Sequence, residues 1–211
     1  MKIAIVACDT FKRELEELVD GDDDFVYHEY LEFGLHEFPK ELKSTVIEKV
    51  NSLEGKVDAV LLGYGTCQSL KDIEKELKVP TVTFHEDDCV GVFLTQDEYN
   101  RERKVCAGTF YAIPYFAEKG IDFFTRDWDK KLGEAAKDID PKAFVKFMFD
   151  GYSRSLYVHT TGDREHYECK AKDFADELEL RFETRDGTLD VMRKAIDQVK
   201  ELARTAPPVS S

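Results

Sequence analysis

Residues 57–89 read VDAVLLGYGTCQSLKDIEKELKVPTVTFHEDDC and contain two short apolar segments, at 58–63 and 79–84. Both segments are too short for a helix and are bounded by Gly, Pro or charged residues. This pattern is typical of strands that are buried on both faces of a parallel sheet. A polar tip that carries a cysteine follows each segment, with Cys67 after the first and Cys89 after the second. The stretch therefore predicts a parallel sheet with thiols at the strand ends.

The amino terminus repeats this arrangement. Residues 2–7 read KIAIVA, and Cys8 follows them directly. The carboxyl ends of parallel strands share one edge of the sheet, which is where ligands bind in open α/β folds. We therefore expect Cys8, Cys67 and Cys89 to lie together at that edge.

Helical segments alternate with these strands. Apolar residues recur at helical spacing in 11–19 and 39–50, and a strand at 25–31 lies between them, interrupted by polar residues as in an edge strand. His36 follows that strand, so it should reach the same edge. Asp9 or Thr10 is expected to cap the first helix, and a helix start beside Cys8 would lower the pKa of its thiol. The alternation predicts an α/β fold, Rossmann-like, with a mostly parallel sheet and flanking helices.

The second half of the chain predicts a further α/β unit. Its strands are expected at 155–160 and 179–183, after a strand at 108–113 that ends the first lobe. An amphipathic helical segment at 122–149, parted near Pro141, should place its aromatic residues in a core. We divide the chain into an α/β lobe with the cysteines at 1–120, a second α/β unit at 121–205 and a flexible tail at 206–211. The pattern leaves open whether these parts form two lobes or share one continuous sheet.

Composition restricts the class of protein. The 211 residues carry a formal net charge of −14, which argues against nucleic acid or an anionic membrane as the main partner. No segment approaches the roughly 20 apolar residues of a membrane span, and no signal peptide precedes the first strand. We expect a cytoplasmic protein. Its five cysteines then indicate reduced thiols or metal ligands instead of a disulfide framework.

The predicted cluster has the ligand types of a zinc site. Three thiolates and an imidazole, from Cys8, Cys67, Cys89 and His36, would bind zinc in tetrahedral geometry. Three alternatives stay open for the cysteines: a three-cysteine iron–sulfur cluster, thiol–disulfide exchange, and a role as small buried apolar residues. Cys106 and Cys169 lack strand-end positions of this kind and are interpreted as structural.

Four further residues are candidates for the same site. His85 lies four residues before Cys89, so it could act as an acid or base or complete the metal coordination. Asp88 could orient a ligating histidine or an incoming substrate. Gly63 and Gly65 follow a strand and precede a helical segment, which makes them candidates for binding the phosphate of a cofactor. They lack the third glycine of a dinucleotide fingerprint, and a tight turn that presents Cys67 is the alternative.

Several short motifs occur in an order that resembles a known but uncharacterised family. They are Ala7-Cys8-Asp9, Leu35-His36 with Pro39, Leu62-Gly63-Tyr64-Gly65 with Cys67, Asp87-Asp88-Cys89, Gly108-Thr109-Phe110-Tyr111, Gly151-Tyr152 and Asp186-Gly187. The resemblance is to a domain-of-unknown-function family of anaerobic archaea and bacteria, often encoded near corrinoid-dependent methyltransferase systems. It implies a Cys/His-rich site and a link to one-carbon metabolism.

Two functional hypotheses follow. The first is an enzyme of methyl or other one-carbon transfer, in which a thiolate-bound metal activates a thiol acceptor or a corrinoid cofactor docks at the site. The alternative is a non-catalytic accessory that binds metal or corrinoid and serves a methyltransferase partner. An open coordination position beside a pocket favours the enzyme, whereas a closed site without a cavity favours the accessory.

Overall fold

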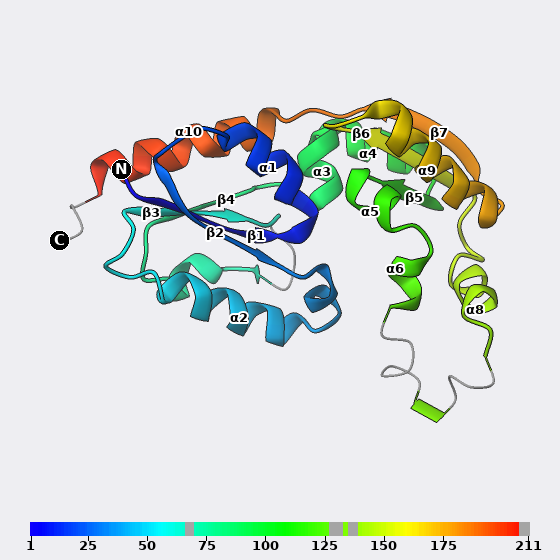
Figure 1. Ribbon diagram of the computed structural model, residues 1–211, viewed down its shortest axis with the longest axis horizontal. Helices are drawn as coiled ribbons and strands as arrows, with labels where there is room; N and C mark the ends of the chain where they lie inside the picture. Colours follow the sequence, from blue (N-terminus) through cyan, green and yellow to red (C-terminus); the bar gives the residue numbers. More distant parts are fainter. Residues whose placement is uncertain (66–69, 127–132, 135–138, 207–211) are drawn as a thin grey trace. The chain divides into compact units, whose positions relative to one another are not determined.

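The computed structural model describes residues 1–65, 70–126, 133–134 and 139–206 (Figure 1). The chain divides into two compact units. The first unit comprises Met1–Gln96 and Thr188–Ser211, and the second comprises Asp97–Gly187. Each unit contains its own parallel sheet, so the α/β class predicted from the sequence is confirmed.

The first sheet has the strand order β2-β1-β3-β4, and every neighbouring pair is parallel. Its strands are β1 (Ile3–Cys8), β2 (Phe25–Leu31), β3 (Ala59–Gly63) and β4 (Thr81–Thr83). All residues of β1 and β3 are buried, as their continuous apolar sequences predict. The partly polar β2 lies at the edge, which confirms its predicted position.

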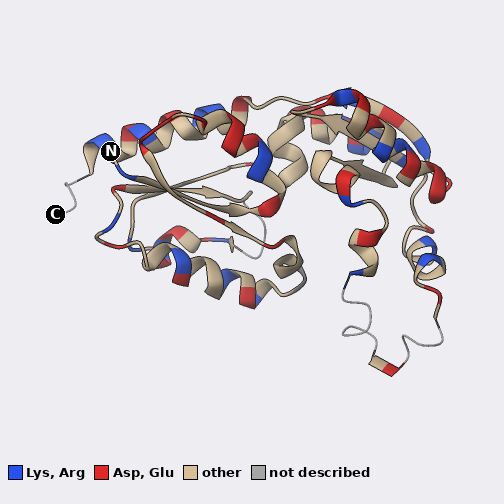
Figure 2. Ribbon diagram, viewed as in Figure 1, with Lys and Arg blue, Asp and Glu red and all other residues tan. Residues whose placement is uncertain are grey.

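Helices cover both faces of this sheet (Figure 1). The described helices of this unit are η1 (Asp9–Phe11), α1 (Lys12–Val19), η2 (Phe33–Glu37), α2 (Pro39–Asn51), η4 (Ile73–Glu76), α3 (Cys89–Leu94) and α10 (Asp190–Thr205). Helix α2 lies on one face, while α1 and α10 lie on the other (Figure 1). Acidic and basic residues alternate along α2 and α10, which bury their apolar residues against the sheet (Figure 2).

The second sheet has the strand order β5-β6-β7 and is also parallel. Its strands are β5 (Thr109–Ala112), β6 (Arg154–His159) and β7 (Arg181–Asp186). Its helices are α4 (Gln96–Val105), α5 (Pro114–Lys119), α6 (Asp122–Thr125), α8 (Pro141–Met148) and α9 (Arg164–Glu177). Arg154 is fully buried at the start of β6, where it pairs with Glu102 at 2.8 Å and Glu183 at 3.2 Å.

Two details differ from the sequence-based prediction. The first unit ends at Gln96 instead of residue 120, because β5 pairs with β6 and belongs to the second sheet, and α10 returns to the first unit. In the described residues of 122–149, helix α6 ends before Pro141 and α8 begins at it, as predicted, but Phe147 and Met148 of α8 are exposed instead of lying in the core. Trp128, Leu132 and residues 207–211 of the predicted tail lie outside the described residues. Among the described helices, none has the length and hydropathy needed to cross a membrane.

Candidate functional site

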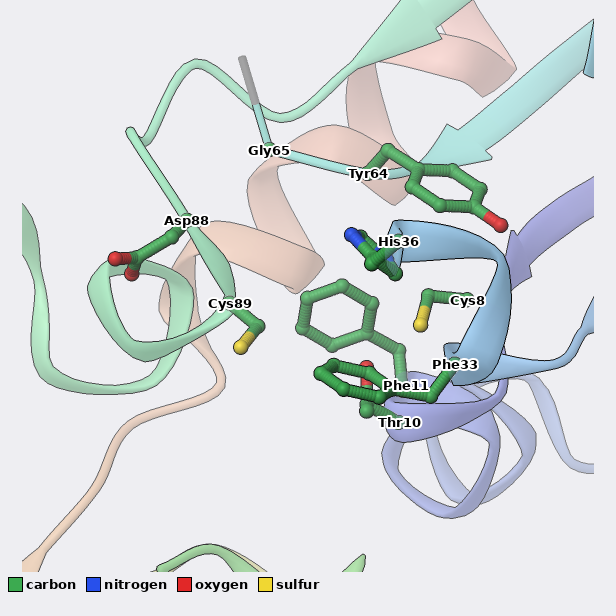
Figure 3. A pocket seen from close by; sticks show the side chains of 9 residues that line it. All are labelled: Cys8, Thr10, Phe11, Phe33, His36, Tyr64, Gly65, Asp88 and Cys89. Carbon is green, nitrogen blue, oxygen red and sulfur yellow. The ribbon is translucent and has the colours of Figure 1, made fainter. Parts of the chain in front are cut away.

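A small pocket lies at the carboxyl edge of the first sheet (Figure 3). Its cavity volume is about 190 Å³, equivalent to roughly six water molecules at ~30 Å³ each. The lining residues come from the segments that follow the ends of β1, β2, β3 and β4: Cys8, Thr10, Phe11, Phe33, His36, Tyr64, Gly65, Asp88 and Cys89. The structure thus brings Cys8, His36 and Cys89 to one site.

Cys8 is the last residue of β1 and is only 2 % exposed. The chain turns directly into η1, so Thr10 and Phe11 line the pocket next to it. The prediction that Asp9 or Thr10 caps the first helix is wrong. Helix α1 begins after Phe11 and has no capping side-chain hydrogen bond, because the 3-10 turn η1 comes between the strand and the helix. The Thr10 hydroxyl is buried and has no hydrogen-bond partner among the described residues.

His36 lies on η2, the turn that follows the edge strand. Its imidazole stacks on the Phe33 ring at a centroid distance of 4.9 Å, and the Tyr64 ring lies 5.9 Å from it. Burial lowers the pKa of His36, which favours the neutral imidazole that ligates metals. Its Nε2 atom is buried and finds no hydrogen-bond partner in the described part of the chain. This nitrogen is therefore available to a ligand.

Cys89 is the first residue of α3 and enters the pocket from a different wall than Cys8 (Figure 3). Burial raises the pKa of the Cys89 thiol, and the negative charges of Asp88 and Cys8 raise it further. Asp88 caps α3, since its Oδ1 accepts hydrogen bonds from the amides of Val90 at 2.9 Å and Gly91 at 3.0 Å. Asp88, which was predicted to orient a ligating histidine or a substrate, thus lines the pocket and also fixes the start of the helix that presents Cys89.

The two glycines predicted to bind a cofactor permit close backbone packing. A Cβ atom on Gly63 would lie 2.4 Å from the Cβ of Ala7, and Gly63 is not among the residues that line the pocket. A Cβ atom on Gly65 would lie 2.7 Å from the carbonyl oxygen of Glu86. Gly65 does line the pocket, so its small size allows the end of β3 to approach the segment that carries Asp88 and Cys89.

The remaining predicted site residues are placed as follows. Cys67 falls in 66–69 and lies outside the described residues. His85 is exposed and is not among the residues that line the pocket. Cys106, in the second unit, contacts the Ser153 hydroxyl at 3.3 Å, and Cys169 is exposed. Within the described residues, no group of three or more His, Cys, Asp or Glu side chains is positioned to hold a metal ion.

The aromatic wall and the hydroxyl of the pocket were not predicted from the sequence. Phe11, Phe33 and Tyr64 each lie within three residues of the end of a strand in the first sheet, as does Thr10. Position after a strand end is the signal that singled out the cysteines, and it would also have found these four residues. Their residue types gave no such signal, because buried aromatic side chains more commonly belong to a core.

Comparisons with known proteins place the chain in a family. Searches among curated proteins and among solved structures found no significant match. A family profile matches residues 30–196, a range that includes His36, Gly65, Asp88 and Cys89 of the pocket. The chain therefore belongs to the family described as Protein of unknown function (DUF1638).

Proposed function

We propose that the pocket would bind zinc through Cys8, Cys67, Cys89 and His36, and that a small thiol would replace His36 as the fourth ligand and so be activated as the acceptor of a methyl group. One observation carries this proposal. Two thiols and an imidazole, supplied by three separate strand ends, line one pocket of about 190 Å³, and the buried Nε2 of His36 has no hydrogen-bond partner among the described residues.

The donor set fits the metal. Thiolate sulfur and neutral imidazole nitrogen are the ligand types that select zinc, and burial keeps His36 neutral. The described residues alone do not form a three-ligand group, and Cys67 follows the pocket residue Gly65 by two positions in the sequence. Zinc held by these donors would keep a substrate thiol in its nucleophilic thiolate form at neutral pH.

The other residues of the pocket have roles that need no metal. Phe11, Phe33 and Tyr64 form an apolar wall that limits water beside the substrate. Asp88 fixes the first turn of α3 and thereby the position of Cys89. His85 is exposed and does not line the pocket, so its proposed role as an acid or base requires movement of the segment between β4 and α3.

The size of the pocket supports the enzyme over the accessory. A purely structural zinc site needs no cavity, whereas a substrate needs room beside the metal. A cavity of about 190 Å³ accepts a small thiol but not a corrinoid macrocycle. A corrinoid methyl donor would therefore be presented by a partner protein at the pocket entrance instead of residing in the pocket.

The metal content of the purified chain tests this proposal. The protein is prepared without air or chelator, and zinc is measured by mass spectrometry for the parent and for the variants Cys8→Ser, Cys67→Ser and Cys89→Ser. We expect about one zinc per chain in the parent, since these residues form a single mononuclear site. Each of the three variants should lose it.

Cys169→Ser is the matched control, because Cys169 is exposed in the second unit and far from the pocket in sequence. It should keep its zinc. Methyl transfer from a methylcorrinoid to a small thiol is then assayed with the zinc-loaded parent. A parent that contains no metal, or three variants that retain it, would contradict the proposal.

A further inference from the structure

The Thr10 hydroxyl is a buried polar group that faces the pocket. Thr10 is 2 % exposed, and its Oγ1 has no hydrogen-bond partner among the described residues. Figure 3 shows the hydroxyl directed from η1 toward the interior of the pocket. Leaving such a group unpaired costs about 1–3 kcal/mol in general, and a ligand atom in the pocket would supply the missing partner.

The charge of the pocket restricts what this ligand can be. Among the described residues that line it there is no Lys or Arg, and the carboxylate present is that of Asp88. The cysteine thiolates proposed as ligands would at least balance the charge of a divalent metal and leave no excess positive charge for an anion. A carboxylate, sulfonate or phosphate on the ligand would lose its hydration without gaining a cationic partner.

Size and wall chemistry narrow the ligand further. Pockets for drug-sized ligands measure roughly 300–1,000 Å³, whereas this cavity measures about 190 Å³. Phe11, Phe33 and Tyr64 give it an apolar wall. A ligand with a short aliphatic body and no charge fits both properties.

We propose that the pocket selects a small uncharged thiol, and that Thr10 positions this thiol by donating a hydrogen bond from Oγ1 to an acceptor atom of the ligand. This inference rests on the proposed function, because it takes a thiol as the ligand. It adds the class of thiol and assigns a specificity-determining residue. Thr10 lies outside the range matched by the family profile, so the assignment comes from the structure of this chain.

Two thiols of the same chain length that differ in charge test the selectivity. The zinc-loaded full chain is titrated with 3-mercapto-1-propanol and with 3-mercaptopropionate, and binding is measured by calorimetry. The neutral thiol should bind at least about tenfold more tightly, because the anion must be buried unpaired. Thr10→Val should weaken binding of the neutral thiol about tenfold, and Thr10→Ser should stay within about threefold of the parent.

Thermal unfolding without a thiol separates positioning from folding. Thr10→Val replaces an unpartnered buried hydroxyl with a methyl group of similar shape, so its Tm should be no lower than that of the parent. Equal binding of the two thiols, no binding of either, or unchanged affinity in Thr10→Val would overturn the inference. Zinc content is measured on the same samples. A parent without zinc contradicts the proposed function, whereas a zinc-loaded parent without selectivity contradicts only this inference.

Discussion

At the scale of single residues, the shape of the pocket depends on a glycine, Gly65, as well as on the side chains that line it. Gly65 lets the end of β3 pass close to the backbone that leads to Cys89, with the Glu86 carbonyl oxygen 2.7 Å from where a Cβ would lie. The neighbouring atoms belong to the backbone, so a rotamer change cannot relieve the contact. A glycine here is therefore a requirement of packing, even though its conformation does not need a positive φ.

Gly65→Ala should destabilise the first unit by about 1–3 kcal/mol, the usual cost of overpacking a well-packed site. It should also reduce zinc content, because Asp88 and Cys89 must move to accommodate the methyl group. Urea unfolding and metal analysis measure the two effects. Gly151→Ala is the control, since a Cβ on Gly151 meets no atom within 4 Å, and its stability should change by less than ~0.5 kcal/mol. Equal stability of the two variants would show that the β3 end has room to adjust.

At the scale of elements, α10 is fixed to the first unit by apolar contacts and by one ion pair. Its buried residues Met192, Ile196 and Val199 face the sheet, mainly β3 and β4. Lys200 pairs with Asp22 in the turn before β2, and its ammonium lies 5.7 Å from the centroid of the Phe25 ring. The hydrogen bond from Lys200 lowers the pKa of Asp22. Helix α10 thus packs on β3 and β4 and is also tied to the start of the edge strand β2.

The lowered pKa of Asp22 predicts a pH dependence of stability. Because the pKa of Asp22 in the folded state lies below its unfolded value of about 3.9, the ion pair contributes fully above that pH. The contribution is lost as the pH falls through the folded pKa. Lys200→Met should therefore lose less stability than the parent between pH 7 and pH 3, by about 0.2–1 kcal/mol. Urea unfolding at the two pH values measures the difference, and an identical loss in both proteins would exclude the ion pair as its cause.

The strands and helices also show which parts of the fold could be predicted from the sequence alone. Buried apolar runs predict β1 and β3 well, because a strand covered on both faces must be apolar at every position. Periodicity does not tell which sheet a strand joins, so the parallel pairing of β5 with β6, across 41 intervening residues from 113 to 153, was missed. The predicted core position of Phe147 was also wrong. An amphipathic pattern predicts which face of a helix is apolar, but it does not tell whether another element packs against that face.

The candidate site was predictable in its location and only partly in its composition. Strand ends in a parallel sheet meet at one edge, which is why Cys8, His36 and Cys89 could be expected together. The side chains around them depend on loop conformation. His85 is exposed although it lies one helical turn from Cys89 in sequence, because the chain between them is not helical before α3 begins at Cys89. Thr10 was assigned to a helix cap and instead faces the pocket.

At the scale of the whole molecule, the chain contains one continuous unit and one discontinuous unit. Residues 97–187 contain the three strands of the second sheet and the described residues of its two apolar clusters. The first unit needs both 1–96 and α10, which covers one face of β1, β3 and β4. The two parts of the first unit meet where the Thr188 amide donates a hydrogen bond to the Phe93 carbonyl at 2.7 Å.

Fragments should reflect this organisation. A fragment of residues 97–187 should unfold cooperatively on heating, because its sheet and core are complete. A fragment of residues 1–96 should show no cooperative transition, since removal of α10 exposes the apolar face of its sheet. Joining 1–96 to 188–206 through a short Gly/Ser linker should restore the transition, as Phe93 and Thr188 are already adjacent. Circular dichroism measures all three, and a cooperatively folded 1–96 fragment would show that α10 is dispensable.

The return of α10 to the first unit has a consequence for biosynthesis. The segments that carry Cys8 and Cys89 leave the ribosome before residues 97–187, and the helix that covers the first sheet leaves after them. At about 5–20 residues per second, translating the inserted segment takes roughly 5–18 seconds. The second unit can complete its sheet during this interval, while the first remains open. Cys8 and Cys89 are thus translated several seconds before the helix that completes their unit, so a metal ion or an oxidant can meet them while the first unit is still incomplete.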